Sequence, residues 1–337
     1  MHETGKMARM PPTCVGLAFK SNQKQQGAKT RRTRELEKGR NGSLMSTKHP
    51  IIAVTGSSGA GTSTVKEAFE HMFRREKIKP AVIEGDSFHR YNRAEMKEAV
   101  ARAESQGDDT FSHFGPEANV FDKLEELFRT YGKTGGGKRR LYLHSEEEAV
   151  PYGGLKPGEF TPWEDIPAGT DLMFYEGLHG AVVNDSVNVP QYVDLNIGVV
   201  PVINLEWIQK IHRDTKTRGY SEEAVMDTIL RRMHDYVHYI VPQFKHSDIN
   251  FQRVPVVDTS DPIIARDIPS PDESVVVIRF RRPENIIVDF PYLLQMLHGS
   301  WMSRRNTIVV PGGKMGLAIE LILTPILQDM MKKSKKA

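Results

Sequence analysis

The segment from Ile51 to Val65, IIAVTGSSGAGTSTV, constrains the fold most strongly, because an apolar β-branched run leads through a glycine-rich turn directly into a helical pattern. In a phosphate-binding loop, successive backbone N–H groups turn inward toward a polyphosphate, and the following helix presents the positive end of its dipole. We therefore predict a nucleotide-binding loop. Its residues are Gly56, Ser57, Ser58, Gly59, Ala60, Gly61, Thr62 and Ser63.

The loop departs from the usual pattern at one position. The two glycines at Gly56 and Gly61 are spaced as expected, but Thr62 stands where lysine is usual, so one positive charge is absent. Ser63 still offers a hydroxyl that can bind Mg²⁺. An ordinary strand-to-helix turn of small residues is the alternative, but the strand before and the helix after are the context that a phosphate loop requires.

Residues 1–44 differ in composition from the rest of the chain. They carry a net charge of +7, whereas the whole chain carries +3 and the remainder therefore −4. Their lack of apolar periodicity predicts disorder. A transit peptide fits poorly with Glu35 and Glu37, and a nucleic-acid-binding arm lacks interleaved aromatic residues. We favour a false upstream start, because Met45 precedes the first strand by a few residues. The acidic remainder argues against nucleic-acid binding.

The only cysteine is Cys14, so an intramolecular disulfide is excluded and no thiol is available in residues 45–337. This composition fits a reducing cytoplasm. No apolar run approaches the length needed to cross a bilayer, and no secretory h-region with a cleavage site is present at the N-terminus. We expect a cytoplasmic protein without membrane association.

Strand-like and helical patterns alternate along residues 45–337, which we treat as one domain. Such alternation predicts an α/β fold with a mostly parallel mixed sheet, helices on both faces, and ligands at the carboxyl ends of the strands. The glycines 135–137 and basic residues 138–140 predict a flexible turn. The expected strands are 51–55, 81–84, 172–175, 192–200, 274–280 and 306–310; the expected helices are 63–75, 93–104, 120–131, 205–217, 292–302 and 317–331.

Chemically useful side chains follow two of these strands. After the second strand, Asp86 can accept a hydroxyl proton, while His89, Arg90 and Arg93 offer positive charge to an anionic substrate. Capping of the next helix by Asp86 or the neighbouring serine is the alternative. After residues 172–175, Glu176 stands where a phosphate-binding fold places a Mg²⁺ partner, unless it is a solvated loop glutamate.

A third group lies on the helix predicted over 205–217. Lys210, Arg213, Asp214 and Arg218 share one face at helical spacing. An exposed charged face is the commonest reason for such a pattern. Because the loop lacks its lysine, however, we expect a mobile helix to bring Lys210 and Arg213 to the phosphates. The adjacent arginines at 231 and 232 either extend this positive surface or are ordinary solvated arginines.

The sequences GSSGAGTSTV, EGDSFHRYNR, FYEGLHG and KIHRDTKTRGYS, in this order and spacing, resemble phosphoribulokinases of the bacterial type. The resemblance extends from about Met45 to the C-terminus, and threonine at position 62 is part of the family's pattern. It implies an adenylate-kinase-like P-loop NTPase fold with Mg-ATP as the donor. The implied acceptor is D-ribulose 5-phosphate, phosphorylated at its C1 hydroxyl to ribulose 1,5-bisphosphate in the Calvin cycle.

The resemblance also implies roles for single residues. Asp86 matches the catalytic base and Asp214 a second essential acid, while Lys210 and Arg213 match a charge-stabilising pair. Glu176 matches an acid that acts through the metal, as Asp214 also does. The residues that match substrate ligands are His89, Arg93 and Arg218, and those that match the ATP-binding loop are residues 56–63.

Regulation is inferred from the same resemblance. Bacterial relatives respond to NADH as activator and AMP as inhibitor and form large homo-oligomers. Arg279, beside Arg281 and Arg282, is a candidate effector residue, although a charged strand end has the same appearance. The disulfide switch of plant and cyanobacterial relatives is excluded, because residues 57–60 contain no cysteine.

Two rival functions remain open. One is another kinase of this fold, such as a uridine or pantothenate kinase, although those normally keep the loop lysine. The other is a nucleotide-binding regulatory module without catalysis.

Overall fold

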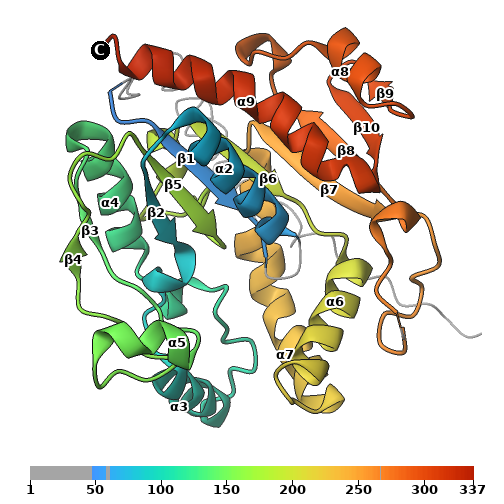
Figure 1. Ribbon diagram of the computed structural model, residues 1–337. Coiled ribbons are helices and arrows are strands. Elements are labelled where there is room, and N and C mark those ends of the chain that lie inside the picture. Colours follow the sequence, from blue (N-terminus) through green and yellow to red (C-terminus); the bar gives the residue numbers. More distant parts are fainter. Residues whose placement is uncertain (1–47, 58–60, 266) are drawn as a thin grey trace, which may run out of the picture. The chain divides into compact units, whose positions relative to one another are not determined.

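The computed structural model describes residues 48–57, 61–265 and 267–337, all within the unit Met45–Ala337 (Figure 1). The expectations for residues 1–44 and for Ser58, Gly59 and Ala60 lie outside the described residues.

An eight-stranded mixed sheet forms the centre of the unit. The first five strands in spatial order are parallel, and the last three add in antiparallel pairing. The predicted mostly parallel mixed sheet is therefore confirmed. In spatial order the strands are β2 (Pro80–Glu84), β5 (Leu172–Gly177), β1 (Ile51–Thr55), β6 (Leu195–Val199), β7 (Ile249–Pro255), β8 (Ser274–Phe280), β10 (Thr307–Pro311) and β9 (Trp301–Arg304).

The helices begin where the sequence provides caps. Asn92 caps the first turn of α3 in a capping box with Glu95, and Ser221 caps α7. None of the described helices is long and apolar enough to cross a membrane. The α-helices are α2 (Thr62–Glu76), α3 (Arg93–Ser105), α4 (Phe121–Thr134), α5 (Glu146–Ala149), α6 (Ile203–Lys216), α7 (Glu222–Asp235), α8 (Phe290–Met296) and α9 (Met315–Ser334).

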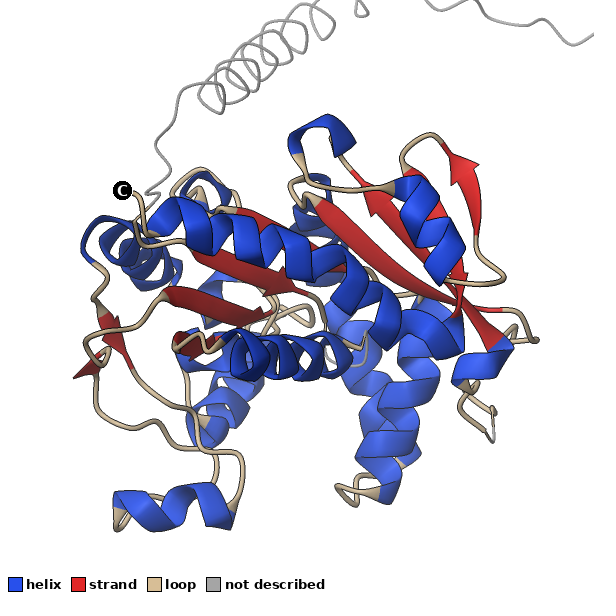
Figure 2. Cartoon of the chain, turned by 45° about the horizontal axis from the view of Figure 1, so that its top comes forward, coloured by secondary structure: helices blue, strands red, loops and turns tan. Residues whose placement is uncertain are grey.

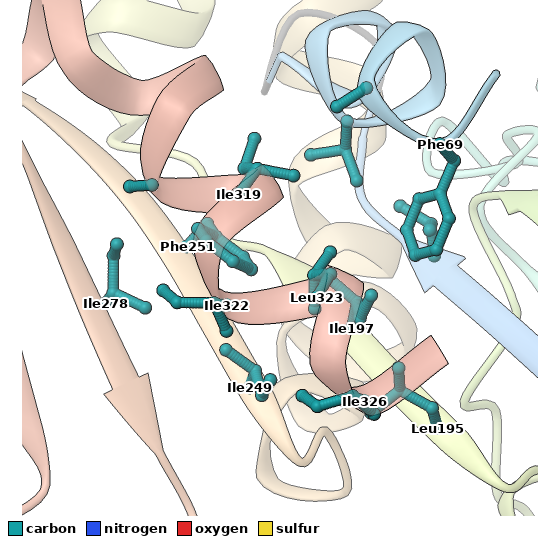
Figure 3. Packing of buried hydrophobic residues seen from close by; sticks show 14 of the residues in the cluster. Phe69, Leu195, Ile197, Ile249, Phe251, Ile278, Ile319, Ile322, Leu323 and Ile326 are labelled. Atoms are coloured by element: carbon teal, nitrogen blue, oxygen red, sulfur yellow. The ribbon is translucent and has the colours of Figure 1, made fainter. Parts of the chain in front are cut away.

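One face of the sheet packs against α2, α8 and α9. Ile322 of α9 lies near Phe251 of β7 (Figure 3), and Phe69 of α2 packs against Phe174 of β5 with their ring centroids 4.8 Å apart. The parallel strands are rich in β-branched residues because both of their faces are covered. This cluster is the larger of the two that enclose the sheet.

The opposite face packs against α4. Phe121, Leu124, Leu127 and Phe128 are buried along one side of this helix, as its apolar spacing predicts. They contact the alternate side chains of β1, including Ile51. Helices therefore cover both faces of the parallel part of the sheet, which leaves its carboxyl edge as the place for a ligand site.

Two local predictions are wrong. The helix expected over 292–302 ends at Met296, because the chain turns through Gly299 at a φ of +82° and continues as β9. The turn expected to be flexible at 138–140 is ordered. Lys138–Arg139 forms β3, which pairs with β4 (Glu164–Asp165). The side chain of Arg140 is held by a hydrogen bond to the carbonyl of Ser87.

The strands β2, β5 and β1 end at the same edge of the sheet. In Figure 1, α3 and α5 lie beyond this edge on one side, and α6 and α7 lie beyond it on the other. Helices and loops, rather than strands, make up this part of the chain (Figure 2). The predicted site residues are carried by these segments.

Candidate active site

The described part of the phosphate loop joins β1 to α2. Gly56 donates its backbone N–H to the carbonyl of Gly177 at 3.2 Å. A Cβ at position 56 would lie 2.7 Å from Thr62 Cγ2 and 2.9 Å from the carbonyl oxygen of Val199, so only glycine fits there. Gly61 begins the helix with a φ of +97°, a left-handed conformation that favours glycine. The structure thus explains why glycine stands at both positions of the motif.

Ser57 is tied to the first turn of α6. Its buried hydroxyl donates to Glu206 Oε1 at 2.5 Å, and the Tyr236 hydroxyl donates to Oε2 of the same carboxylate at 3.3 Å. Burial raises the pKa of Glu206, although these hydrogen bonds oppose the rise. Glu206 was not predicted from the sequence, because an acid in the first turn of a helix has an ordinary explanation in the helix dipole.

Asp86 lies in the short turn Gly85–Phe88 that follows β2. Its Oδ1 is 3.3 Å from His89 Nε2, and its Oδ2 is 3.9 Å from His144 Nε2. Burial alone would raise the pKa of Asp86, but these histidines and His113 outweigh it and lower the pKa to about 2. Asp86 is therefore an ionised acceptor at neutral pH. It does not cap the next helix, because Asn92 does.

Glu176 belongs to β5 itself rather than to a solvated loop, and it lies opposite Glu84 of β2. Burial raises its pKa, and the carboxylates of Asp86 and Glu84 add to the rise, while a hydrogen bond from Thr62 opposes it. Lys66 pairs with Glu84 at 2.9 Å. The threonine that replaces the usual lysine thus contacts an acid instead of supplying a charge.

This acidic edge is compatible with Mg²⁺. No group of three metal-binding side chains occurs within residues 48–57, 61–265 and 267–337. Mg²⁺ in nucleotide sites, however, normally binds one or two protein oxygens together with water and phosphate. The carboxylate of Glu176 offers such an oxygen, and a cation would relieve the repulsion among the neighbouring acids. The side chain of Ser63, the second predicted ligand, lies outside the described part of the chain.

The predicted helical face on α6 is not an exposed charged surface. The side chain of Asp214 is 6% exposed, and its carboxylate accepts hydrogen bonds from Lys210, from Arg213 Nε at 2.9 Å and from Arg218 Nη1 at 3.2 Å. Three cations therefore gather around one buried acid. Their side chains grow more exposed along the face, from Lys210 at 10% to Arg218 at 53%.

The charges in this group affect one another. Burial opposes ionisation of Asp214, but the hydrogen bonds from Lys210 and Arg213 lower its pKa. Burial and repulsion from Arg232 lower the pKa of Lys210 to about 8. The pKa values of Asp214 and Lys210 are both lowered because several cations share one anion. Positive charge is in excess here, which suits a site for phosphate oxygens.

The two arginines at the end of α7 have different roles. Arg231 pairs with Glu104 of α3 at 2.5 Å, so it joins two helices. Arg232 lies over the Phe114 ring, 5.3 Å from its centroid, and burial lowers its pKa to about 10. The charge of Arg232 faces both Asp214 and Asp86. It extends the positive surface, whereas Arg231 does not behave as a simple solvated arginine.

The proposed acceptor ligands His89 and Arg93 follow the Asp86 turn, at the start of the segment that leads into α3. His89 is 8% exposed, whereas Arg93 is exposed at the start of α3, where its Nη2 donates to the carbonyl of His144 at 3.5 Å. Arg140, which the sequence analysis placed in a flexible turn, donates to the carbonyls of Ser87 at 2.8 Å and His89 at 2.6 Å. These two hydrogen bonds fix the backbone of the Asp86 turn.

The structure thus brings Asp86, Glu176 and the phosphate loop to adjacent strand ends. Arg232 connects them electrostatically with the Asp214 group. Arg279 lies apart from them, exposed on β8 opposite Asn250 in the antiparallel pairing with β7. A glycine-rich loop, a base and a set of cations at the carboxyl edge of a parallel sheet are the parts of a P-loop kinase.

Comparison with known proteins agrees with this class. The Phosphoribulokinase / Uridine kinase family matches residues 51–260. The chain is 66% identical over 293 residues to the chromosomal phosphoribulokinase of Cupriavidus necator, covering 87% of this chain and 99% of that protein. It is 64% identical over 293 residues to phosphoribulokinase 1 of Cereibacter sphaeroides, covering 87% of this chain and all of that protein.

A solved structure is similar over the same length. The phosphoribulokinase from Rhodobacter spheroides superposes with a TM-score of 0.78 at 61% identity, covering 86% of this chain and 99% of that chain. The chain therefore belongs to the phosphoribulokinase / uridine kinase family.

Proposed function

We propose that this kinase transfers the γ-phosphoryl group of ATP to the C1 hydroxyl of D-ribulose 5-phosphate, giving ribulose 1,5-bisphosphate for the Calvin cycle. The observation that carries the proposal is 66% identity across 99% of a phosphoribulokinase. The arrangement of Asp86, Asp214 and their cations supports the same chemistry, because phosphoryl transfer requires positioning and charge neutralisation more than covalent catalysis.

In this mechanism Asp86 accepts the proton of the C1 hydroxyl as that oxygen attacks the γ-phosphorus. Its low pKa keeps it ionised and ready to accept a hydrogen bond from the hydroxyl. A weak base is sufficient. In a loose transition state the bond to the attacking oxygen is barely formed, so the hydroxyl does not have to lose its proton beforehand. His89 and Arg93 would hold the 5-phosphate of the acceptor through charge-assisted hydrogen bonds.

The negative charge on the transferred group would be neutralised from α6. Lys210 and Arg213 replace the absent loop lysine, and Arg218 reaches the acceptor from the more exposed end of the same face. Asp214 orients these cations through hydrogen bonds. Because Lys210 is buried, its attraction to phosphate oxygens is stronger than it would be in water.

The phosphate loop, residues 56–63, would bind the phosphates of ATP. Ser63 and Glu176 would hold Mg²⁺, and Asp214 would act through it as the second acid. Bound Mg²⁺ supplies charge neutralisation and orientation of the β- and γ-phosphates. The oxygen donors at this edge and the raised pKa of Glu176 support this assignment.

A substrate comparison tests the proposed acceptor. ADP release should be measured by a coupled assay with ribulose 5-phosphate, uridine and pantothenate at equal concentrations, and the sugar product identified by mass spectrometry. We expect turnover with ribulose 5-phosphate alone. Faster turnover with uridine or pantothenate would make the protein another kinase of the same family. No acceptor-dependent ADP release would make it a regulatory nucleotide-binding module.

Regulation and assembly form a second, separable part of the proposal. We infer a cytoplasmic homo-oligomer that is activated by NADH and inhibited by AMP, with Arg279 as an effector ligand, on the basis of its resemblance to bacterial phosphoribulokinases. The exposed position of Arg279 on β8 supports an accessible cation. Arg279→Ala should lower the activation by NADH and leave the rate without NADH unchanged. Sedimentation measurements would give the oligomeric state.

A further inference from the structure

Asn119 lies directly opposite His89 on a neighbouring segment of chain. The two residues form an isolated antiparallel bridge. Backbone hydrogen bonds flank them on both sides, from Arg90 N to the Ala118 carbonyl at 2.7 Å and from Val120 N to the Phe88 carbonyl at 2.9 Å. The backbone therefore fixes the distance between the two side chains before any contact between them is considered.

The orientation of the Asn119 amide is determined by its neighbours. Its Nδ2 donates to the carbonyls of His113 at 2.9 Å and Gly115 at 2.7 Å. Both partners are backbone oxygens that can only accept, so the amide cannot be turned the other way. Its Oδ1 then faces His89 Nδ1 at 2.9 Å. Because an amide oxygen can only accept, Nδ1 of His89 must carry a proton.

The other ring nitrogen of His89 faces an anion. Nε2 is 3.3 Å from Oδ1 of Asp86, which is ionised at neutral pH. Asn119 therefore occupies Nδ1 and leaves Nε2 as the ring nitrogen that faces the reaction site. We propose that Asn119 is a positioning residue that fixes the orientation and the Nδ1 proton of the His89 ring, so that Nε2 is the nitrogen available to Asp86 and to the acceptor. This inference rests on the proposed roles of Asp86 and His89.

Other titratable groups surround the ring of His89. The ring of His113 is 4.9 Å away, and burial together with nearby positive charge lowers its pKa to about 3. Burial also lowers the pKa of His179 to about 3. Both rings are therefore neutral at working pH. His144 approaches the far oxygen of Asp86, and Arg140 donates to the His89 carbonyl rather than to its ring.

Two substitutions at one position test the proposal. Asn119→Leu removes the acceptor for Nδ1, whereas Asn119→Asp replaces it with an anionic acceptor. The KM values for ribulose 5-phosphate and for ATP should be measured at one pH for both variants. The leucine variant should show a KM for ribulose 5-phosphate about tenfold higher, with little change in the KM for ATP. The aspartate variant keeps an acceptor for Nδ1 and should show a much smaller rise.

Nitrogen NMR of the imidazole rings gives a readout that does not depend on activity. Uniformly ¹⁵N-labelled native protein should show a proton on Nδ1 of His89, with its resonances assigned by their loss in His89→Gln. Asn119→Leu should lose this fixed preference for Nδ1. Asn184→Leu is the control for the same substitution, because the Asn184 amide oxygen accepts from the backbone N–H groups of Ser186 and Val187 in a turn elsewhere.

The outcomes separate this inference from the function on which it rests. If His89→Gln leaves the KM for ribulose 5-phosphate unchanged, the proposed role of His89 is wrong. If His89→Gln raises that KM but Asn119→Leu leaves it unchanged, or raises the KM for ATP equally, Asn119 has only a structural role and the inference fails. A native protein in which Nδ1 of His89 carries no proton would also overturn it.

Discussion

Asp86→Asn separates acceptor binding from catalysis. Asparagine keeps the size of the side chain and one oxygen for hydrogen bonding, but it cannot take up the hydroxyl proton. Loss of a positioned general base costs about 10² to 10⁴ in rate, or about 2.7 to 5.4 kcal/mol of transition-state stabilisation. Binding of ribulose 5-phosphate should be retained. The substitution removes the anion that lies 3.3 Å from His89 and 3.9 Å from His144, so these rings would be left to face the phosphate of the acceptor.

The assay measures both quantities on one preparation. Turnover is followed by coupled ADP release, and affinity for ribulose 5-phosphate by isothermal titration without ATP. We expect kcat to fall by at least about a hundredfold, with affinity unchanged or higher. Asp122→Asn, the same change at an exposed site on α4, is the control. Retention of more than about a tenth of native kcat would refute the assignment of the base, and Asp214 would be tested next. Equal losses of affinity and turnover would indicate a structural role.

Three further changes test other parts of the site. The pKa of Lys210 is lowered to about 8, so its cationic form predominates below that pH. Above that pH, kcat/KM for ATP should fall about tenfold per pH unit. A kcat/KM that stays constant up to about pH 10 would contradict this role of Lys210. Thr62→Lys should lower kcat by crowding Glu176 and repelling the cations of α6, whereas an increase would show that the phosphates are under-neutralised in the native protein. Removal of residues 1–44 should leave kcat and the melting temperature unchanged, because the relatives match over 293 residues; a clear loss of either would show that the segment contributes to the fold.

The carboxyl-edge residues could be predicted because each follows an obvious strand. Gly56, Asp86 and Glu176 come at or after short apolar runs, and parallel strands bring such positions together. The helical spacing on α6 likewise predicted the shared face. The burial of that face was not predicted, because spacing alone cannot distinguish a solvated stripe from cations gathered around Asp214.

Other residues could not be predicted, because their roles depend on partners far away in the sequence. Asn119 and Arg140 stand in loop sequence with no motif, and their contacts with the Asp86 turn arise only from the tertiary fold. The strand Ile249–Pro255 was missed because polar side chains and a terminal proline interrupt its pattern. The helix expected over 292–302 was predicted from an apolar run. It is shorter in the structure, because the left-handed backbone conformation of Gly299 does not continue a helix.

The buried carboxylate of Glu206 has a thermodynamic consequence. It belongs to α6, the helix that carries Lys210 and Asp214, yet one of its oxygens accepts the hydroxyl of Ser57 in the phosphate loop. The first turn of α6 cannot withdraw from the loop without leaving a buried carboxylate less well bonded, which costs free energy. Any ligand that favours one arrangement of the loop must therefore favour the corresponding position of α6, and by reciprocity a change in α6 alters the affinity of the loop.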